Sequence, residues 1–135
     1  MPSFMQQLLL AALPTLALAA SNPSVEASNG VYQGVSNEHY KQEFFLGIPY
    51  AQPPTGDLRF ASPKALTEKF DEPRDATQYG NACIGYGSDT ENLDAPLSED
   101  CLTLNIVRPA GTQPGDDLPV GIWVHGGVSF RNKHL

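Results

Sequence analysis

The run from Leu118 to His125 constrains the fold of this chain more than any other segment. It is almost wholly apolar, with Val120, Ile122 and Trp123 at its centre, and it lacks the strict alternation of a strand that exposes one face to water. Such a run is typical of a strand that is covered on both faces in the middle of a sheet. The sequence therefore predicts a central strand over 118–125, which ends at Gly126-Gly127 and needs a neighbouring strand on each side.

Other short apolar segments predict further strands. Asn29-Gly30 favours positive φ and a type I′ turn, which predicts a hairpin between Ser24–Ala27 and Ser28–Tyr32. Two more strands are predicted: Gln42–Gly47, which contains Phe44, Phe45 and Leu46, and Leu102–Val107, which is apolar and β-branched and is followed by Pro109 and Gly111. The stretches between them contain several prolines or have no clear period and are predicted to be irregular: Ile48–Phe60 and Pro63–Gly87.

The amino terminus predicts a secretory leader. Leu8–Ala20 is apolar but shorter than the roughly 20 residues that cross a bilayer. Ala17-Leu18-Ala19 fits an A-x-A cleavage signal, and a polar stretch follows at once. We therefore expect residues 1–19 to be a signal peptide and the protein to be secreted, without stable membrane insertion. The alternative is a buried or anchoring helix.

Charge and cysteine usage exclude several classes of function. The formal net charge is −7 and no cluster of Lys or Arg occurs, which argues against nucleic acid and anionic membrane surfaces as partners. Only Cys83 and Cys101 are present, and in a secreted chain they are expected to form a disulfide. The alternative is two free buried thiols. Their spacing is not that of metal ligands, so no metal site is predicted.

Three strings in the chain occur together in one order. They are Phe45–Phe60 (FLGIPYAQPPTGDLRF), Ser98–Ile106 (SEDCLTLNI) and Leu118–Gly127 (LPVGIWVHGG). In this order and spacing they resemble the amino-terminal part of the type-B carboxylesterase/lipase family, over about Ser24 to Gly127. The resemblance implies an α/β-hydrolase fold, here incomplete, with a mixed central sheet and an antiparallel amino-terminal hairpin. It also implies hydrolysis of small-molecule or lipid esters by Ser, an acid and His, without a cofactor.

The resemblance also implies structural pairs. The family pairs a cysteine at the position of Cys101 with an earlier one, which Cys83 fits. It pairs an arginine at the position of Arg59 with a glutamate at that of Glu99, which would tie the proline-rich string to the disulfide loop. The alternative is two solvated side chains, whose pairing would contribute about 0–1 kcal/mol.

The third string carries the chemistry that the chain retains. In α/β-hydrolases an H-G-G-G-type loop donates a backbone N–H to the oxyanion of the transition state. The family's donors are the second and third glycines of this row, whose positions are Gly127 and Val128 here, with Gly126 before them. The branched side chain of Val128 departs from the pattern. The alternative for Gly126-Gly127 is an ordinary turn after a strand, and His125 is expected to pack rather than to act as a base.

The triad itself is not expected in these residues. No G-x-S-x-G string occurs; Ser36 and Ser129 come nearest, and both lack the closing glycine. We expect 20–127 to be the amino-terminal part of the catalytic domain and 128–135 to be an unrelated tail, consistent with intron read-through, because common intron starts translate as Val-Ser. The chain is then expected to be inactive alone. The alternative is a non-catalytic secreted binding module on the same scaffold.

Overall fold

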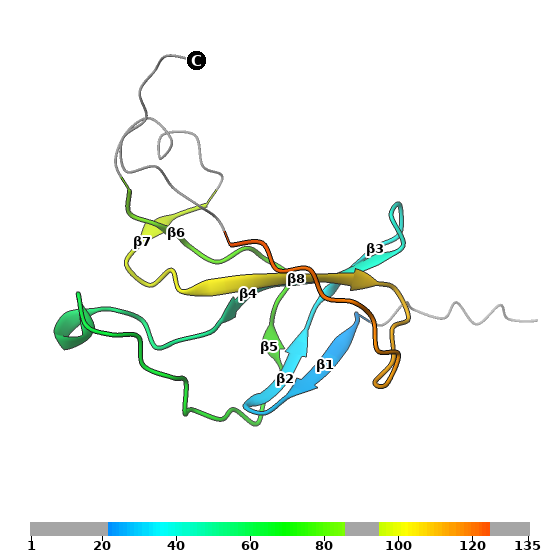
Figure 1. Cartoon of the computed structure of the whole chain (residues 1–135), viewed down its shortest axis with the longest axis horizontal. Coiled ribbons are helices and arrows are strands. Elements are labelled where there is room, and N and C mark those ends of the chain that lie inside the picture. Colours follow the sequence, from blue (N-terminus) through cyan, green and yellow to red (C-terminus); the bar gives the residue numbers. More distant parts are fainter. Residues whose placement is uncertain (1–21, 86–94, 125–135) are drawn as a thin grey trace, which may run out of the picture.

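The computed structural model describes residues 22–85 and 95–124, whose path is shown in Figure 1. The predicted leader, residues 86–94 and everything from His125 onward lie outside the described residues. The described elements are a short 3-10 helix, η1 (Gly56–Leu58), and the strands β1 (Ser24–Ala27), β2 (Gly30–Gln33), β3 (Val35–Asn37), β4 (Gln42–Pro49), β5 (Arg74–Asp75), β6 (Ala82–Cys83), β7 (Leu97–Ser98) and β8 (Thr103–Pro109).

These strands form three small sheets. In the first, β1 pairs antiparallel with β2, and β2 pairs parallel with β5. In the second, β4 lies between β3 and β8, and both pairings are antiparallel. β6 and β7 form a parallel pair. The arrangement mixes parallel and antiparallel pairing and begins with an antiparallel hairpin, as predicted.

The turn of this hairpin differs from the prediction. Ala27 pairs with Gly30, so the loop residues are Ser28 and Asn29, and neither has the positive φ that a type I′ turn requires. Gly30 has the positive φ instead, at 141°, and a Cβ at this position would overlap the ring of Phe70. The glycine therefore permits close packing of Phe70, whose backbone N–H donates to the carbonyl of Asn29 at 3.0 Å.

A small apolar core joins the first two sheets. It consists of Tyr32 on β2, Phe45 on β4 and Ala76 just after β5, and Phe45 is only 2% exposed. Phe70 closes the cluster with an edge-to-face contact to Tyr32, at 5.2 Å between ring centroids. A backbone hydrogen bond joins the same two regions, because the Leu46 N–H donates to the carbonyl of Ala76 at 2.7 Å. Burial of aromatic surface between the sheets holds them together.

The strands predicted at Gln42–Gly47 and Leu102–Val107 are confirmed as β4, which continues to Pro49, and β8, which covers Thr103–Pro109. They are the longest strands described, and they pair with each other from Gln42↔Pro109 to Pro49↔Thr103. The register shifts between Phe45 and Ile48, where Gly47 has a φ of 65°. The N–H of Gly47 donates to the side chain of Asn105 at 2.9 Å, which satisfies a donor that the irregular ladder leaves free.

The irregular stretches are also confirmed. Residues 50–73 contain only the short helix η1, and the described part of Pro63–Gly87 adds no more than the two-residue strands β5 and β6. In the part of the chain that the structure describes, no helix has the length and apolarity that crossing a bilayer requires.

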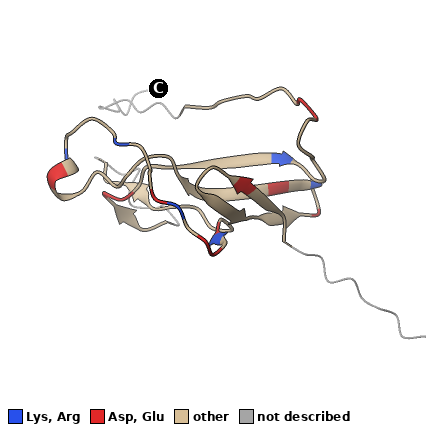
Figure 2. Ribbon diagram, turned by 90° about the horizontal axis from the view of Figure 1, so that it is seen from below, with Lys and Arg blue, Asp and Glu red and all other residues tan. Residues whose placement is uncertain are grey.

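The strand predicted over 118–125 is wrong for its described part. Residues 118–124 have no regular secondary structure, and the side chains of Val120, Ile122, Trp123 and Val124 are 82–88% exposed. In Figure 1 the segment passes across β8, whereas the turned view of Figure 2 shows it apart from the strands. The run has the composition of a buried strand, but no described element lies against it, so its apolar side chains remain in solvent.

Candidate functional site

The predicted oxyanion residues Gly126, Gly127 and Val128 lie outside the described residues, as does His125. The structure describes the segment that leads to them, 118–124, and the turn that precedes it. It also describes the predicted disulfide and the predicted ion pair.

Cys83 and Cys101 form a disulfide in the structure, with 5.1 Å between their Cα atoms. The bond joins β6 to the chain just beyond β7, across 18 residues of sequence. The side-chain amide of Asn81 donates to the carbonyl of Asp100 at 3.0 Å and closes the same junction. The covalent link and this hydrogen bond thus fix the start of β8 relative to β6.

The predicted pair of Arg59 and Glu99 is also brought together. The Nε of Arg59 lies 2.8 Å from a carboxylate oxygen of Glu99. The two side chains are 59% and 34% exposed, so solvent screens the pair and its contribution to stability is about 0–1 kcal/mol. The contact ties the residue after η1 to the disulfide loop, which is an architectural role.

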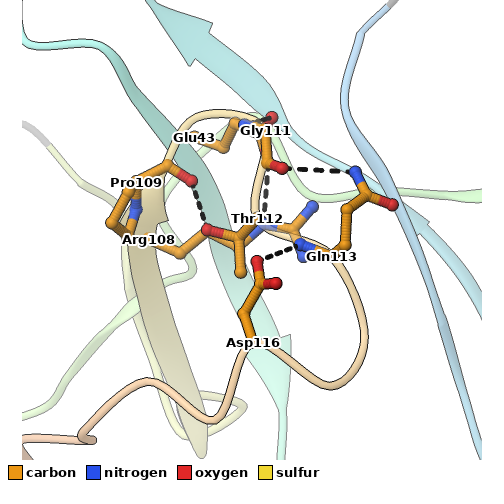
Figure 3. Close-up of polar contacts among 7 residues, drawn as sticks. All are labelled: Glu43, Arg108, Pro109, Gly111, Thr112, Gln113 and Asp116. Atoms are coloured by element: carbon orange, nitrogen blue, oxygen red, sulfur yellow. Dashed lines mark hydrogen bonds and ion pairs between the residues drawn. The ribbon is translucent and has the colours of Figure 1, made fainter.

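A second ion pair, which the sequence reasoning missed, lies between the two long strands. Glu43 on β4 faces Arg108 on β8 in the register, and Nε of Arg108 donates to the carboxylate at 2.7 Å. The other carboxylate oxygen accepts the backbone N–H of Gly111 at 3.1 Å (Figure 3). The guanidinium also lies over the ring of Phe45, 5.0 Å from its centroid. The pair depends on the register between β4 and β8, and no local pattern in the sequence indicates which residues of these two strands lie opposite each other.

The electrostatics of Glu43 follow from these contacts. Burial raises the pKa of this carboxyl, but the N–H of Gly111 and the guanidinium of Arg108 outweigh it and hold the pKa below its ordinary 4.5. Glu43 is therefore an ionised hydrogen-bond acceptor at neutral pH. Its role in the structure is to join the strand pair to the turn that follows β8.

That turn is closed by its own hydrogen bonds, which Figure 3 shows together. The hydroxyl of Thr112 donates to the carbonyl of Pro109 at 2.7 Å, and the backbone N–H of Gln113 donates to the carboxylate of Asp116 at 2.8 Å. The side chain of Gln113 reaches back to the carbonyl of Gly111 at 3.2 Å. The turn between β8 and the apolar run is therefore closed by hydrogen bonds and leads directly into 118–124.

The described surface offers little else for chemistry. A shallow hollow of about 350 Å³ lies beside η1 and is lined by Gln52, Pro53, Thr55, Leu58, Leu66, Thr67 and Glu68. Glu68 is the single ionisable side chain in that lining. Over residues 22–85 and 95–124, no three His, Cys, Asp or Glu side chains are grouped as a metal site requires.

Comparison with known proteins identifies the family. The model of the carboxylesterase family matches residues 21–133. "Gut esterase 1" of Caenorhabditis elegans is 39% identical over 107 residues, which are 79% of this chain and 18% of that protein. "Lipase 5" of Diutina rugosa is 37% identical, over 86% of this chain and 24% of its own length. The chain therefore spans about a fifth of the length of these relatives.

Solved structures agree with the sequence matches. Aspergillus niger EstA superposes with a TM-score of 0.64 at 37% identity, over 73% of this chain and 18% of that one. A structure of PNB esterase gives a TM-score of 0.67 at 34% identity, over 79% and 22%. The mixed sheets described above are thus a partial α/β-hydrolase fold. With a family match over most of its length and esterases as its structural neighbours, the chain belongs to the carboxylesterase family.

Proposed function

We propose that this chain is the amino-terminal part of a secreted serine carboxylic-ester hydrolase and contributes the oxyanion loop to its active site. The observation that carries the proposal is the family match over residues 21–133, which contains Gly126-Gly127 directly after the apolar run 118–125. Glycines at this place let the backbone approach a substrate closely. The relatives are named as esterases and lipases, so the substrate class is a small-molecule or lipid ester.

The chemistry of this part of the site is electrostatic. When a serine alkoxide attacks an ester carbonyl, the carbonyl oxygen becomes an oxyanion. The backbone N–H of Gly127, and that of Val128 in the position of the next donor, would stabilise this charge, each by about 2.7–4 kcal/mol. The β-branched side chain of Val128 restricts its backbone and would intrude near the substrate, so Gly127 is the donor that matches the family's pattern.

We further propose that these 135 residues do not hydrolyse esters alone. The sequence contains no G-x-S-x-G string, and the serines that come nearest to one, Ser36 and Ser129, lack its closing glycine. Support for secretion comes from the apolar stretch Leu8–Ala20 with its A-x-A signal, and from the Cys83–Cys101 disulfide, which suits an oxidising compartment.

An ester-hydrolysis assay with p-nitrophenyl butyrate, combined with a fluorophosphonate probe for activated serines, tests the inactivity. We expect turnover equal to the buffer rate and no labelling by the probe. The matched controls are Ser36→Ala and Ser129→Ala, which should behave as the unmodified chain does. Turnover or labelling that disappears in either variant would contradict the proposal.

The gene tests the other half of the proposal. Reading the genomic sequence beyond the codon of Gly127 should reveal an open reading frame with a G-x-S-x-G string, followed by an acid and then a histidine. A downstream sequence without this string would contradict assignment to a serine hydrolase.

A further inference from the structure

Asn29-Gly30, at the turn between β1 and β2, is the single Asn-Gly dipeptide of the chain. In such a pair the backbone nitrogen of the glycine can attack Cγ of the asparagine, because the glycine has no Cβ to obstruct the approach. A bond forms between that nitrogen and Cγ, the bond from Cγ to Nδ2 breaks, and ammonia leaves with the proton of the backbone nitrogen. Water then opens the resulting succinimide at one of its two carbonyls, which yields aspartate or isoaspartate.

The structure restrains the asparagine of this pair. Its Nδ2 donates to the hydroxyl oxygen of Tyr32 at 2.9 Å, and that tyrosine is only 3% exposed, so the amide is held by a fixed part of the core. On the backbone, Gly30 pairs with Ala27 at the end of the β1–β2 register. Closing the five-membered ring takes the backbone of an asparagine out of its allowed regions, so the backbone and the side chain of Asn29 must both rotate. These contacts oppose that rotation.

Phe70 covers the same dipeptide from the irregular stretch before β5. Its backbone N–H donates to the carbonyl of Asn29 at 3.0 Å, and its ring and carbonyl occupy the space in which a Cβ on Gly30 would lie. The ring makes an edge-to-face contact with Tyr32, and the guanidinium of Arg74 lies 4.4 Å from its centroid. Tyr32 and Arg74 are partners in the β2–β5 register, so Phe70 rests on a paired part of the sheet.

We propose that Asn29 is a latent deamidation site: the contacts of Phe70 and Tyr32 restrain the reaction in the folded chain, and it proceeds when the segment around Phe70 opens. That segment contains no strand between η1 and β5, and its opening leaves the β1–β2 pairing in place. Local openings of this kind cost less free energy than global unfolding. The proposal goes beyond ester hydrolysis and does not depend on it.

The two products should differ in their effect on the turn. In the aspartate form the new carboxylate can accept a hydrogen bond from the hydroxyl of Tyr32, so this contact is kept with its direction reversed. The isoaspartate form adds a methylene to the main chain and displaces the carbonyl to which the Phe70 N–H donates. Because ammonia is lost, formation of isoaspartate would release Phe70 irreversibly.

The rate of this conversion in the full, disulfide-intact chain tests the proposal. Samples are incubated at mildly alkaline pH, folded or unfolded in guanidinium chloride, and cleavage after Glu26 and Glu38 then gives the peptide 27–38 for mass spectrometry. We expect aspartate and isoaspartate at Asn29 to form at least about tenfold more slowly in the folded chain. Asn37 lies in the same peptide and is followed by Glu38 instead of glycine, so it is an internal reference that should change little.

Three variants separate the contact of Phe70 from general stability. Phe70→Leu should raise the rate in the folded chain about tenfold, because it weakens the packing over Gly30. The matched control Phe60→Leu makes the same substitution at a side chain that is 96% exposed, and should leave the rate unchanged. Phe45→Leu weakens the core from β4, and should accelerate the reaction less than Phe70→Leu does.

Tyr32→Phe tests the side-chain contact with the least disturbance. It keeps the ring in the core and removes the hydroxyl, and should raise the rate about twofold to tenfold. Circular dichroism establishes that each variant is folded. Equal rates in the folded and unfolded chain would overturn the proposal, as would a rate in Phe70→Leu no higher than in Phe60→Leu or Phe45→Leu. If Phe70→Leu does not fold, a rate in Tyr32→Phe equal to that of the unmodified chain would overturn it.

Discussion

Two apolar runs of this chain differ in burial: one is covered by neighbouring strands and the other is exposed to solvent. Strand β4 contains Phe45 and Leu46, which are 2% and 6% exposed, and it lies between β3 and β8. The run 118–124 contains Val120, Ile122 and Trp123, which are 84–88% exposed, and no described strand pairs with it. Composition alone would rank the second run as the better candidate for the centre of a sheet.

The difference shows that an apolar sequence favours burial of a segment, but the segment is buried only where other strands pair with it or pack against it. β4 is buried because β2, β8 and the residues after β5 bring partners to it. Residues 118–124 leave the sheet through an ordered turn and meet no comparable partner in the described ranges. Unpaired backbone and exposed apolar side chains together form a surface that favours association with other strands.

The largest expected effect compares matched truncations in the two runs. Phe45→Ala should lower the free energy of unfolding by about 3–5 kcal/mol, because it empties the centre of the core. Trp123→Ala, which removes a larger side chain, should change it by less than about 0.5 kcal/mol, since the indole is 88% exposed. Urea unfolding followed by circular dichroism measures both. An equal loss of unfolding free energy in the two variants would contradict the difference in burial between the two runs.

The disulfide gives the next effect. Replacing Cys83 and Cys101 by serine together should cost about 3 kcal/mol, the chain-entropy estimate for a loop of 18 residues. The same urea titration measures the loss, and the unmodified chain treated with a reductant provides the control. A double variant as stable as the oxidised chain would show that β6 and β8 are held together without the covalent link.

Acid should weaken the junction between the two regions. Because the pKa of Glu43 lies below 4.5 in the folded chain, its stabilising contribution is complete above that value and is lost as pH falls through the folded pKa. Glu43→Gln should therefore cost about 1.5–3 kcal/mol near neutral pH, and the difference from the unmodified chain should shrink as pH falls through the lowered pKa of Glu43. A difference independent of pH would mean that charge is irrelevant at this position.

The variant with the smallest expected effect on stability should still reduce association between copies of the chain. Val120→Lys places a charge on an exposed apolar side chain, so the free energy of unfolding should change by less than about 0.5 kcal/mol. Light scattering of concentrated samples should nevertheless fall, because a lysine in an unpaired extended segment opposes edge-to-edge pairing. Scattering identical to that of the unmodified chain would place the association surface elsewhere.

Much of this architecture is predictable from the sequence, and the failures have physical causes. Local signals located the β1–β2 hairpin and the strands β4 and β8, because apolar runs and turn residues act over short distances. The contact between Glu43 and Arg108 was not predictable, since it depends on a register between residues 65 apart. The strand at 118–125 was predicted wrongly, because periodicity reports what a segment could bury and not whether a partner is present.

For the candidate site, the sequence was sufficient to identify the residues, whereas the contacts that hold them in place could be seen only in the structure. The motif strings contain Arg59, Glu99 and Cys101, and the family's pairing assigned Cys83 to Cys101; each of these two pairs is in contact. The turn that precedes 118–124 lies outside these strings. Its anchoring to β4 through Gly111 became visible only with the hydrogen bonds in place.

The most direct test of the contrast between the two runs is acrylamide quenching of Trp123 in a dilute, monomeric sample whose circular dichroism shows folded β-structure. As the single tryptophan, 88% exposed, it should be quenched as strongly as free N-acetyltryptophanamide and emit at the same wavelength. A blue-shifted emission that acrylamide barely quenches would show that 118–124 is buried in the monomer and would contradict the account.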